Sequence, residues 1–211
     1  MLAGMVPFNV VQQDEEPSFR VHRASEGTVL IESGAPGISG LLNVEGFAIA
    51  MHADIRSVQW GKLLFNLNNA LVALSDLPLA SELSDRHWRS LLAAQIVEAL
   101  AAMKAAGIRP GRVAGPPPAL LPTILRLPDF LFLRLAKRML AIDPEARSSM
   151  WEDLQRGRKT EIDELQGAIL RLAARAGTRA PLVERISALV REAEARGQGS
   201  PRLSAGAISQ A

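Results

Sequence analysis

The sequence predicts an α+β protein, in which a mainly α-helical C-terminal domain follows a few β-strands. The first fifty or so residues contain short β-branched or aromatic segments, which are typical of strands. From about residue 55 onward, apolar residues recur at spacings of three and four, which indicates amphipathic helices. Hydrophobic residues make up 48% of the 211 residues and charged residues 22%, as in an ordinary globular protein.

Three segments near the N-terminus are expected to be strands. They are "MVPFNVV" (5–11), "SFRVHRA" (18–24) and "GTVLIES" (27–33), and "GAPGISG" (34–40) is expected to be a loop. Three strands bury little apolar surface by themselves. Residues 1–54 are therefore not expected to be a complete domain.

Helices are expected from residue 55 to residue 196, which we assign to one helical domain. The first is a single buried helix over 54–75, and the second runs over 85–106 with Ser84 as its N-cap. Five prolines in 110–122 interrupt the helices. Further helices are expected at 128–141, 148–155, 161–176 and 182–196, and 197–211 is expected to be a disordered tail.

Composition excludes several classes of function. The chain has no cysteine and a net charge of only +2, so thiolate chemistry is absent and a nucleic-acid partner is not expected. No run of 18 apolar residues predicts a membrane span, and a cytoplasmic location is expected. His22, His52 and His87 are far apart in the sequence, so no metal site is predicted.

The segment "WGKLLFNLNNAL" (60–71) carries polar residues on a largely apolar helix. Lys62 and Asn66 are four residues apart and share one helix face, and Asn69 follows about one turn later. Such a polar stripe is commonly the solvent-facing side of a helix. Asparagine is a poor helix former, however, so the stripe also fits a binding site for a ligand or a partner.

The segment "SSMWEDLQRGRKTEID" (148–163) also has two interpretations. Ser149 can cap the short helix, and Thr160 can cap the next helix. Glu161 would then be the first residue of that helix, where the helix dipole stabilises a carboxylate. The spacing of these residues does not distinguish caps from ligands of a bound molecule.

Taken together, the two segments resemble the ketopantoate reductase (2-dehydropantoate 2-reductase) family. The chain contains W-x-K-L-x-x-N at 60–66, S-S-M-x-x-D at 148–153 and T-E-I-D at 160–163, and the resemblance extends over about residues 5–190. It implies a helical domain like the C-terminal domain of 6-phosphogluconate dehydrogenase. Residues 1–54 would then be the closing strands of an incomplete Rossmann domain.

The resemblance also implies roles for particular residues. Lys62 would be the general acid that protonates the ketone oxygen, and Glu161 would bind a substrate hydroxyl and orient the lysine. Asn66 and Ser149 would bind the substrate. Asn69 would supply a second carboxamide, a role for which Asn68 also remains open.

The implied function is NADPH-dependent reduction of ketopantoate to pantoate, a step of pantothenate and coenzyme A biosynthesis, and a homodimer is possible. The chain lacks a G-x-G-x-x-G turn, so the cofactor-binding residues are unknown and little NADPH affinity is expected of this chain alone. Two alternatives remain open. One is a non-catalytic helical module that binds keto acids or dimerises, and the other is a paralogue that reduces a different branched 2-keto acid.

Overall fold

The computed structural model divides the chain into two compact units. It describes residues 2–8, 10–15, 18–23, 27–34, 37–113, 115–137 and 143–209. Unit 1 comprises Met1–Gly61 and Pro110–Ala114, and unit 2 comprises Lys62–Arg109 and Gly115–Ala211. The division between the units therefore falls inside a helix, seven residues later than the boundary expected from the sequence.

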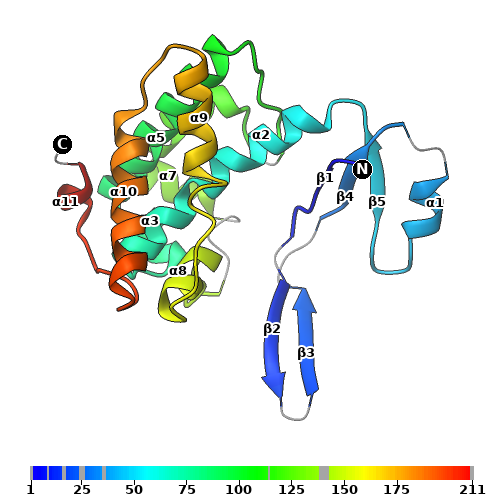
Figure 1. Cartoon of the computed structure of the whole chain (residues 1–211), viewed down its shortest axis with the longest axis horizontal. Helices are drawn as coiled ribbons and strands as arrows, with labels where there is room; N and C mark the ends of the chain where they lie inside the picture. The colour runs from blue at the N-terminus through cyan, green and yellow to red at the C-terminus, as the bar shows by residue number, and fades with distance from the viewer. Residues whose placement is uncertain are drawn as a thin grey trace. The chain divides into compact units, whose positions relative to one another are not determined.

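Unit 1 contains a three-stranded sheet and a hairpin (Figure 1). In the sheet, β4 (Val29–Glu32) lies between β1 (Gly4–Met5), to which it is antiparallel, and β5 (Ile49–His52), to which it is parallel. The hairpin pairs β2 (Val10–Glu15) with β3 (Ser18–Arg23). The strands expected over 18–24 and 27–33 are confirmed as β3 and β4, and β5 is an additional strand. The strand expected over 5–11 is wrong, because that segment contains only the end of β1 and the start of β2.

The expectation of a loop over 34–40 is wrong at its end, because α1 (Ile38–Leu42) begins inside that segment. This helix connects β4 to β5, and a crossover of this kind is what a parallel pair of strands requires. A five-residue helix has too few apolar repeats to produce a periodic signal in the sequence.

The helix α2 (Ile55–Asn66) starts in unit 1, where Ile55 and Val58 form a small core with Met5. The returning segment 110–113 packs closely on this helix. The Gly111 N–H donates to the Ser57 carbonyl at 2.6 Å, and a Cβ atom on Gly61 would overlap the Gly111 carbonyl oxygen. Gly61 is therefore required by the close approach of two backbones.

Unit 2 is helical in its described residues, and α10 packs against α3, α5 and α9 (Figure 1). Its elements are α3 (Asn68–Ser75), α4 (Leu79–Ser84), α5 (Arg86–Ala105), the 3-10 helix η1 (Pro118–Leu120), α6 (Leu121–Leu125), α7 (Asp129–Ala136), α8 (Ser149–Gln155), α9 (Gln166–Arg175), α10 (Pro181–Arg196) and α11 (Ala205–Ser209). Part of the helix expected over 128–141 lies outside the described residues.

The N-cap expected for α5 is wrong by one residue. Asp85 is the cap, because its carboxylate accepts a hydrogen bond from the His87 N–H at 2.8 Å. The Ser84 hydroxyl instead donates to the Ala80 carbonyl within α4. Both serine and aspartate are good caps, so the sequence alone does not separate the two positions.

One buried cation joins α4, α5, α6 and α7. The Arg89 side chain is fully buried, donates to the backbone carbonyls of Leu83, Ser84, Leu125 and Leu127, and pairs with Asp129 at 2.7 Å. Its guanidinium also stacks on the Phe132 ring. Because every side of the cation has a partner, Arg89 holds the segment after α6 against the start of α5.

The expectation of a disordered tail is wrong. The Leu203 N–H donates to the Leu74 carbonyl at 2.8 Å, and the Ile208 side chain of α11 is fully buried. The Arg202 side chain pairs with Asp76, which caps α3, at 3.0 Å. Low complexity in the sequence concealed an apolar anchor, Ile208.

In the described residues, no helix is long and apolar enough to cross a membrane.

The contact between Gly61 and Gly111 predicts that an added methyl group at Gly61 lowers the stability of the fold. Gly61→Ala should lower the free energy of unfolding by about 1 to 3 kcal/mol, because the new methyl group would displace the returning backbone. Gly40→Ala is the control, since nothing lies within 4 Å of its Cβ position and alanine favours a helix. Chemical denaturation measures both, and equal stabilities of the two variants would contradict the contact.

Candidate functional site

The segment that carries Lys62, Asn66 and Asn69 is divided between two helices, which corrects the expectation of a single helix over 54–75. α2 ends at Asn66, α3 begins at Asn68, and Leu67 between them keeps helical dihedral angles of φ −58° and ψ −24°. Its N–H still donates to the Leu63 carbonyl at 3.0 Å. The chain therefore keeps helical geometry at Leu67, where the regular helix is interrupted for one residue, and we call this interruption the bend. Lys62 and Asn66 precede the bend, and Asn69 follows it.

Asn68 and Asn69 differ in their surroundings. The Asn68 side chain is buried, and its Nδ2 donates to the Glu82 carboxyl at 2.7 Å. Asn69, like Lys62 and Asn66, is partly exposed. The amide of Asn68 is thus occupied by an internal partner, which leaves Asn69 as the carboxamide that a ligand can reach.

Glu82 is an unusual residue because its carboxyl lies in the interior of the helical unit. Its side chain is fully buried, and its Oε1 has no partner among the described residues. Burial raises the pKa of Glu82 to about 8, and the hydrogen bond from Asn68 lowers this pKa in part. The carboxyl is therefore protonated at neutral pH.

Ser148, and not Ser149, caps α8, which corrects the cap expected from the sequence. The Ser148 Oγ accepts from the Trp151 N–H at 3.1 Å and donates to the Asn69 carbonyl at 2.9 Å. Ser149 is the first residue of α8 and is exposed. Since Ser148 binds the backbone of Asn69, the next residue, Ser149, is held close to the segment after the bend.

Glu161 does not start a helix, which corrects a second expectation. Residues 161–165 form turns, in which the Glu161 carbonyl accepts from the N–H groups of Glu164 and Leu165, and α9 begins at Gln166. Thr160 stabilises this turn, because its Oγ1 accepts from the Ile162 N–H at 3.3 Å. The helix dipole therefore does not explain the carboxylate at this position. The Glu161 side chain is exposed.

Lys62 and Glu161 interact electrostatically although 99 positions separate them in the chain. Partial burial lowers the pKa of the Lys62 amine below its usual range, and the negative charge of Glu161 raises this pKa in part. A lysine whose pKa is lowered toward neutral pH can give up a proton more readily than an exposed one. The structure thus brings together the two residues that the sequence predicted to be catalytic.

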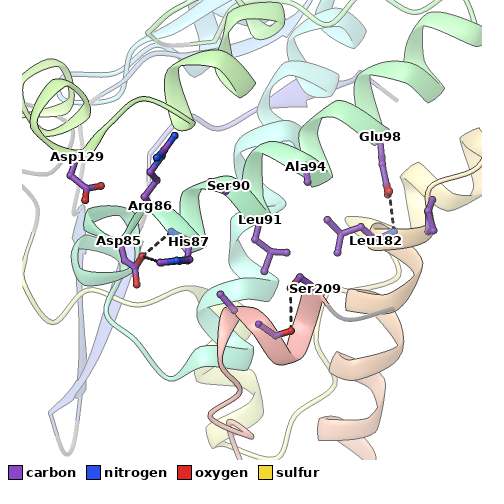
Figure 2. Close-up of a pocket in the computed structure, with 13 residues that line it drawn as sticks. Asp85, Arg86, His87, Ser90, Leu91, Ala94, Glu98, Asp129, Leu182 and Ser209 are labelled. Carbon is purple, nitrogen blue, oxygen red and sulfur yellow. Dashed lines mark hydrogen bonds and ion pairs between the residues drawn. The ribbon is translucent and has the colours of Figure 1, made fainter.

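A groove between α5, α10 and α11 lies elsewhere in unit 2 (Figure 2). Its lining includes Asp85, His87 and Ser209, but none of the five predicted site residues. Glu98, at one end, accepts hydrogen bonds from the N–H groups of Leu182 and Val183 at 3.0 Å and so caps α10. The polar groups that line the groove are thus partly used within the fold, and we do not assign the site to it.

No group of three or more histidine, cysteine, aspartate or glutamate side chains in the described part of the chain could hold a metal ion.

The sequence matches a family model described as the ketopantoate reductase PanE/ApbA C terminal over residues 54–194, which is more than half of the chain. The chain belongs to this family. The match contains the positions of Lys62, Asn66, Asn69, Ser149 and Glu161.

Individual proteins show the same relationship. A 2-dehydropantoate 2-reductase of Mesorhizobium japonicum is 30% identical over 149 residues, which are 69% of this chain and 39% of the relative. A PanE/ApbA family ketopantoate reductase of Ralstonia eutropha JMP134 superposes with a TM-score of 0.70 at 25% identity, over 93% of this chain and 60% of that one. A ketopantoate reductase of Staphylococcus aureus, described as dimeric, has a TM-score of 0.66 at 18% identity, over 93% and 62%.

The chain thus spans less than two thirds of the length of these relatives. Dinucleotide cofactors are commonly bound where a glycine-rich turn joins a strand to the N-terminus of a helix. In the described part of unit 1, β4 leads to α1, which is only five residues long, and the connection lacks the G-x-G-x-x-G pattern. The described residues therefore do not fit a dinucleotide cofactor.

Sequence reasoning missed the buried polar residues beneath the site, Glu82 and Gln166. The three asparagines at 66, 68 and 69 were a signal for the bend, because each is a poor helix former. No signal in the sequence distinguishes Glu82 and Gln166 from the exposed glutamates and glutamines on the other helices.

The interaction between Lys62 and Glu161 predicts that the pKa of Lys62 is lowered and depends on Glu161. The chain has only four lysines, and the other three, Lys104, Lys137 and Lys159, are exposed. After reductive carbon-13 methylation, nuclear magnetic resonance should give Lys62 the lowest pKa of the four. Glu161→Gln should lower the pKa of Lys62 further, because it removes the charge that raises it. A Lys62 pKa that does not respond to Glu161→Gln would contradict the contact.

The protonated Glu82 predicts how stability depends on pH. Its folded-state pKa of about 8 lies above the ordinary value of 4.5, so the folded protein keeps a proton that the unfolded chain loses between these pH values. This contribution to stability is complete below pH 4.5 and is lost as the pH rises to about 8. Glu82→Gln can still accept from Asn68 and does not titrate. Relative to the parent, it should gain about 3 to 4 kcal/mol of unfolding free energy between pH 5 and pH 8 in denaturation experiments. If the difference in unfolding free energy between Glu82→Gln and the parent did not change with pH, Glu82 would not have the raised pKa.

Proposed function

We propose that the chain provides the substrate side of a ketopantoate reductase, which uses NADPH to reduce the ketone of ketopantoate to the alcohol of pantoate. The observation that carries the proposal is the partly buried Lys62 amine, coupled to Glu161 and placed in the segment that matches the family. The nicotinamide supplies a hydride to the carbonyl carbon in this class of reaction. The chain's own residues supply the proton and hold the keto acid.

Lys62 is proposed to protonate the ketone oxygen. As a hydride reaches the carbonyl carbon, negative charge develops on the oxygen, and an ammonium group next to it stabilises that charge. Transfer of a proton from Lys62 Nζ to the oxygen completes the alcohol and leaves a neutral amine. Partial burial already favours the neutral amine, so this transfer costs less than it would from an exposed lysine.

Glu161 is proposed to keep the Lys62 amine protonated before the reaction. Its negative charge raises the pKa of Lys62, so that the amine still carries a proton when the substrate arrives. The carboxylate is exposed and can also accept a hydrogen bond from a hydroxyl of the substrate.

Asn66, Asn69 and Ser149 are proposed to bind the polar groups of the keto acid. The two asparagines are partly exposed on either side of the bend at Leu67, and Ser149 is held near Asn69 by the bond from Ser148. Amide and hydroxyl groups both donate and accept hydrogen bonds. They can therefore orient a keto acid without adding a charge that competes with Lys62.

A homodimer is part of the proposal. The described residues of α7 expose Phe130 and Leu135, at 71% and 67%, which is more apolar surface than a short helix in solution usually shows. Sedimentation of the chain tests this, and a monomer at all concentrations would contradict it.

The binding of ketopantoate tests the proposal without requiring turnover. Calorimetry should show that ketopantoate binds to the chain, and Lys62→Ala should weaken this binding by about 10 to 100-fold through loss of a charged hydrogen bond. If NADPH oxidation is measurable in the same samples, Lys62→Ala should slow it by about 100 to 10,000-fold. Lys104→Ala is the matched control, because Lys104 is an exposed lysine at the end of α5.

Two results would contradict the proposal. One is that ketopantoate binds no better than pyruvate or other short keto acids. The other is that Lys62→Ala and Lys104→Ala behave alike. Tighter binding of another branched 2-keto acid would keep the mechanism and change the substrate.

A further inference from the structure

Three consecutive residues at the bend between α2 and α3 are each held by a different part of the helical unit. The Leu67 carbonyl accepts from Gln166 Nε2 at 3.0 Å, the Asn68 amide donates to Glu82 at 2.7 Å, and the Asn69 carbonyl accepts from Ser148 at 2.9 Å. A turn between two helices does not require side-chain bonds at every residue. These three bonds hold the segment between α2 and α3 from outside it.

Gln166 is the member of this set that connects the two predicted catalytic residues. It is the first residue of α9, and the turn that precedes it starts at Glu161. Its side chain reaches Leu67, which follows Lys62 by five positions. One fully buried amide thus joins the backbone that carries Lys62 to the backbone that carries Glu161.

The orientation of this amide is determined by its partners. Gln166 Nε2 donates both to the Leu67 carbonyl and to Gln95 Oε1, at 3.0 and 3.3 Å, and a reversed amide would place two oxygens against each other. Gln166 Oε1 and Gln95 Nε2 are buried without a partner among the described residues. An apolar side chain at position 166 would remove Gln166 Oε1 but would take away the donor to Gln95 Oε1, so the two amides depend on each other.

We propose that Gln166 is a positioning residue, which fixes the bend at Leu67 relative to the turn at Glu161 and so sets the separation between Lys62 and Glu161. This proposal rests on the proposed function only for its consequence in catalysis. The geometric part, the coupling between the two charged groups, can be measured whatever the substrate is.

Gln166 and Leu67 are each connected to a predicted catalytic residue through a short stretch of hydrogen-bonded backbone. From Gln166 the connection to Glu161 runs through a hydrogen-bonded turn, since Leu165 N–H donates to the Glu161 carbonyl and Gly167 N–H donates to the Ile162 carbonyl. From Leu67 the connection to Lys62 runs through the last turn of α2, closed by the bond from Leu67 to Leu63. Both paths are hydrogen-bonded backbone, so we expect loss of the amide bond to loosen the coupling between the two backbones.

The test is a double-mutant cycle with Gln95 as the matched control. Gln166→Met removes the bond to Leu67 and keeps the volume of the side chain, whereas Gln95→Met leaves that bond in place. Each variant loses one fully buried amide. Thermal unfolding of both variants records how much stability is lost with each amide.

The deciding readout is the change in the pKa of Lys62 caused by Glu161→Gln, measured by carbon-13 lysine resonance in the parent and in each background. In Gln166→Met this change should shrink to less than about half of its value in the parent, and in Gln95→Met it should persist. Equal changes in the two backgrounds would overturn the proposal. If Gln166→Met does not fold, Gln166→Asn repeats the test with an amide that is one methylene too short to reach Leu67.

Binding of ketopantoate separates this proposal from the proposed function. Where the parent binds ketopantoate, Gln166→Met should weaken binding about tenfold, and Gln95→Met should weaken it by less than about threefold. If the parent does not bind ketopantoate, the proposed function fails, but the lysine titration still decides whether Gln166 positions Lys62 against Glu161.

Discussion

The bend at Leu67 is the constraint on which the candidate site depends. It lies between Asn66 and Asn69, and buried or partly buried bonds from Gln166, Glu82 and Ser148 hold it. Lys62, Asn66 and Asn69 follow each other at spacings of four and three, so helical geometry through Leu67 keeps all three close to one face. Because the three bonds come from α9, α4 and the start of α8, the bend forms only when the helical unit is assembled. The site is thus a property of the packed unit and not of one helix.

Partial burial of Lys62 determines the acidity of the amine in the candidate site. Lys62 is partly buried, which lowers the pKa of its amine, and Glu161 offsets this effect with a charge that comes from a distant turn. Glu82, which accepts a hydrogen bond from Asn68, is protonated near neutral pH and so adds no second negative charge to the segment. A cation with one carboxylate and several neutral donors around it suits a reaction in which negative charge develops on one oxygen.

The sequence predicted the elements well where an apolar repeat was long, and less well where local geometry decides. The helix expected over 161–176 is confirmed from Gln166 onward, where Ile169 and Leu172 are buried at helical spacing. The starts of helices were misplaced at Ser84, Ser149 and Glu161, since several good caps stand next to each other. The residues that hold the bend could not be predicted, because contacts such as Gln166 with Leu67 join positions 99 apart in the chain.

The central claim is that Lys62 faces the ketone of a bound keto acid. It is tested most directly by adding ketopantoate to the methylated chain and following the four lysine resonances. The account predicts that the Lys62 signal shifts with saturation while those of Lys104, Lys137 and Lys159 stay in place. Saturable binding that leaves the Lys62 signal unchanged would contradict it.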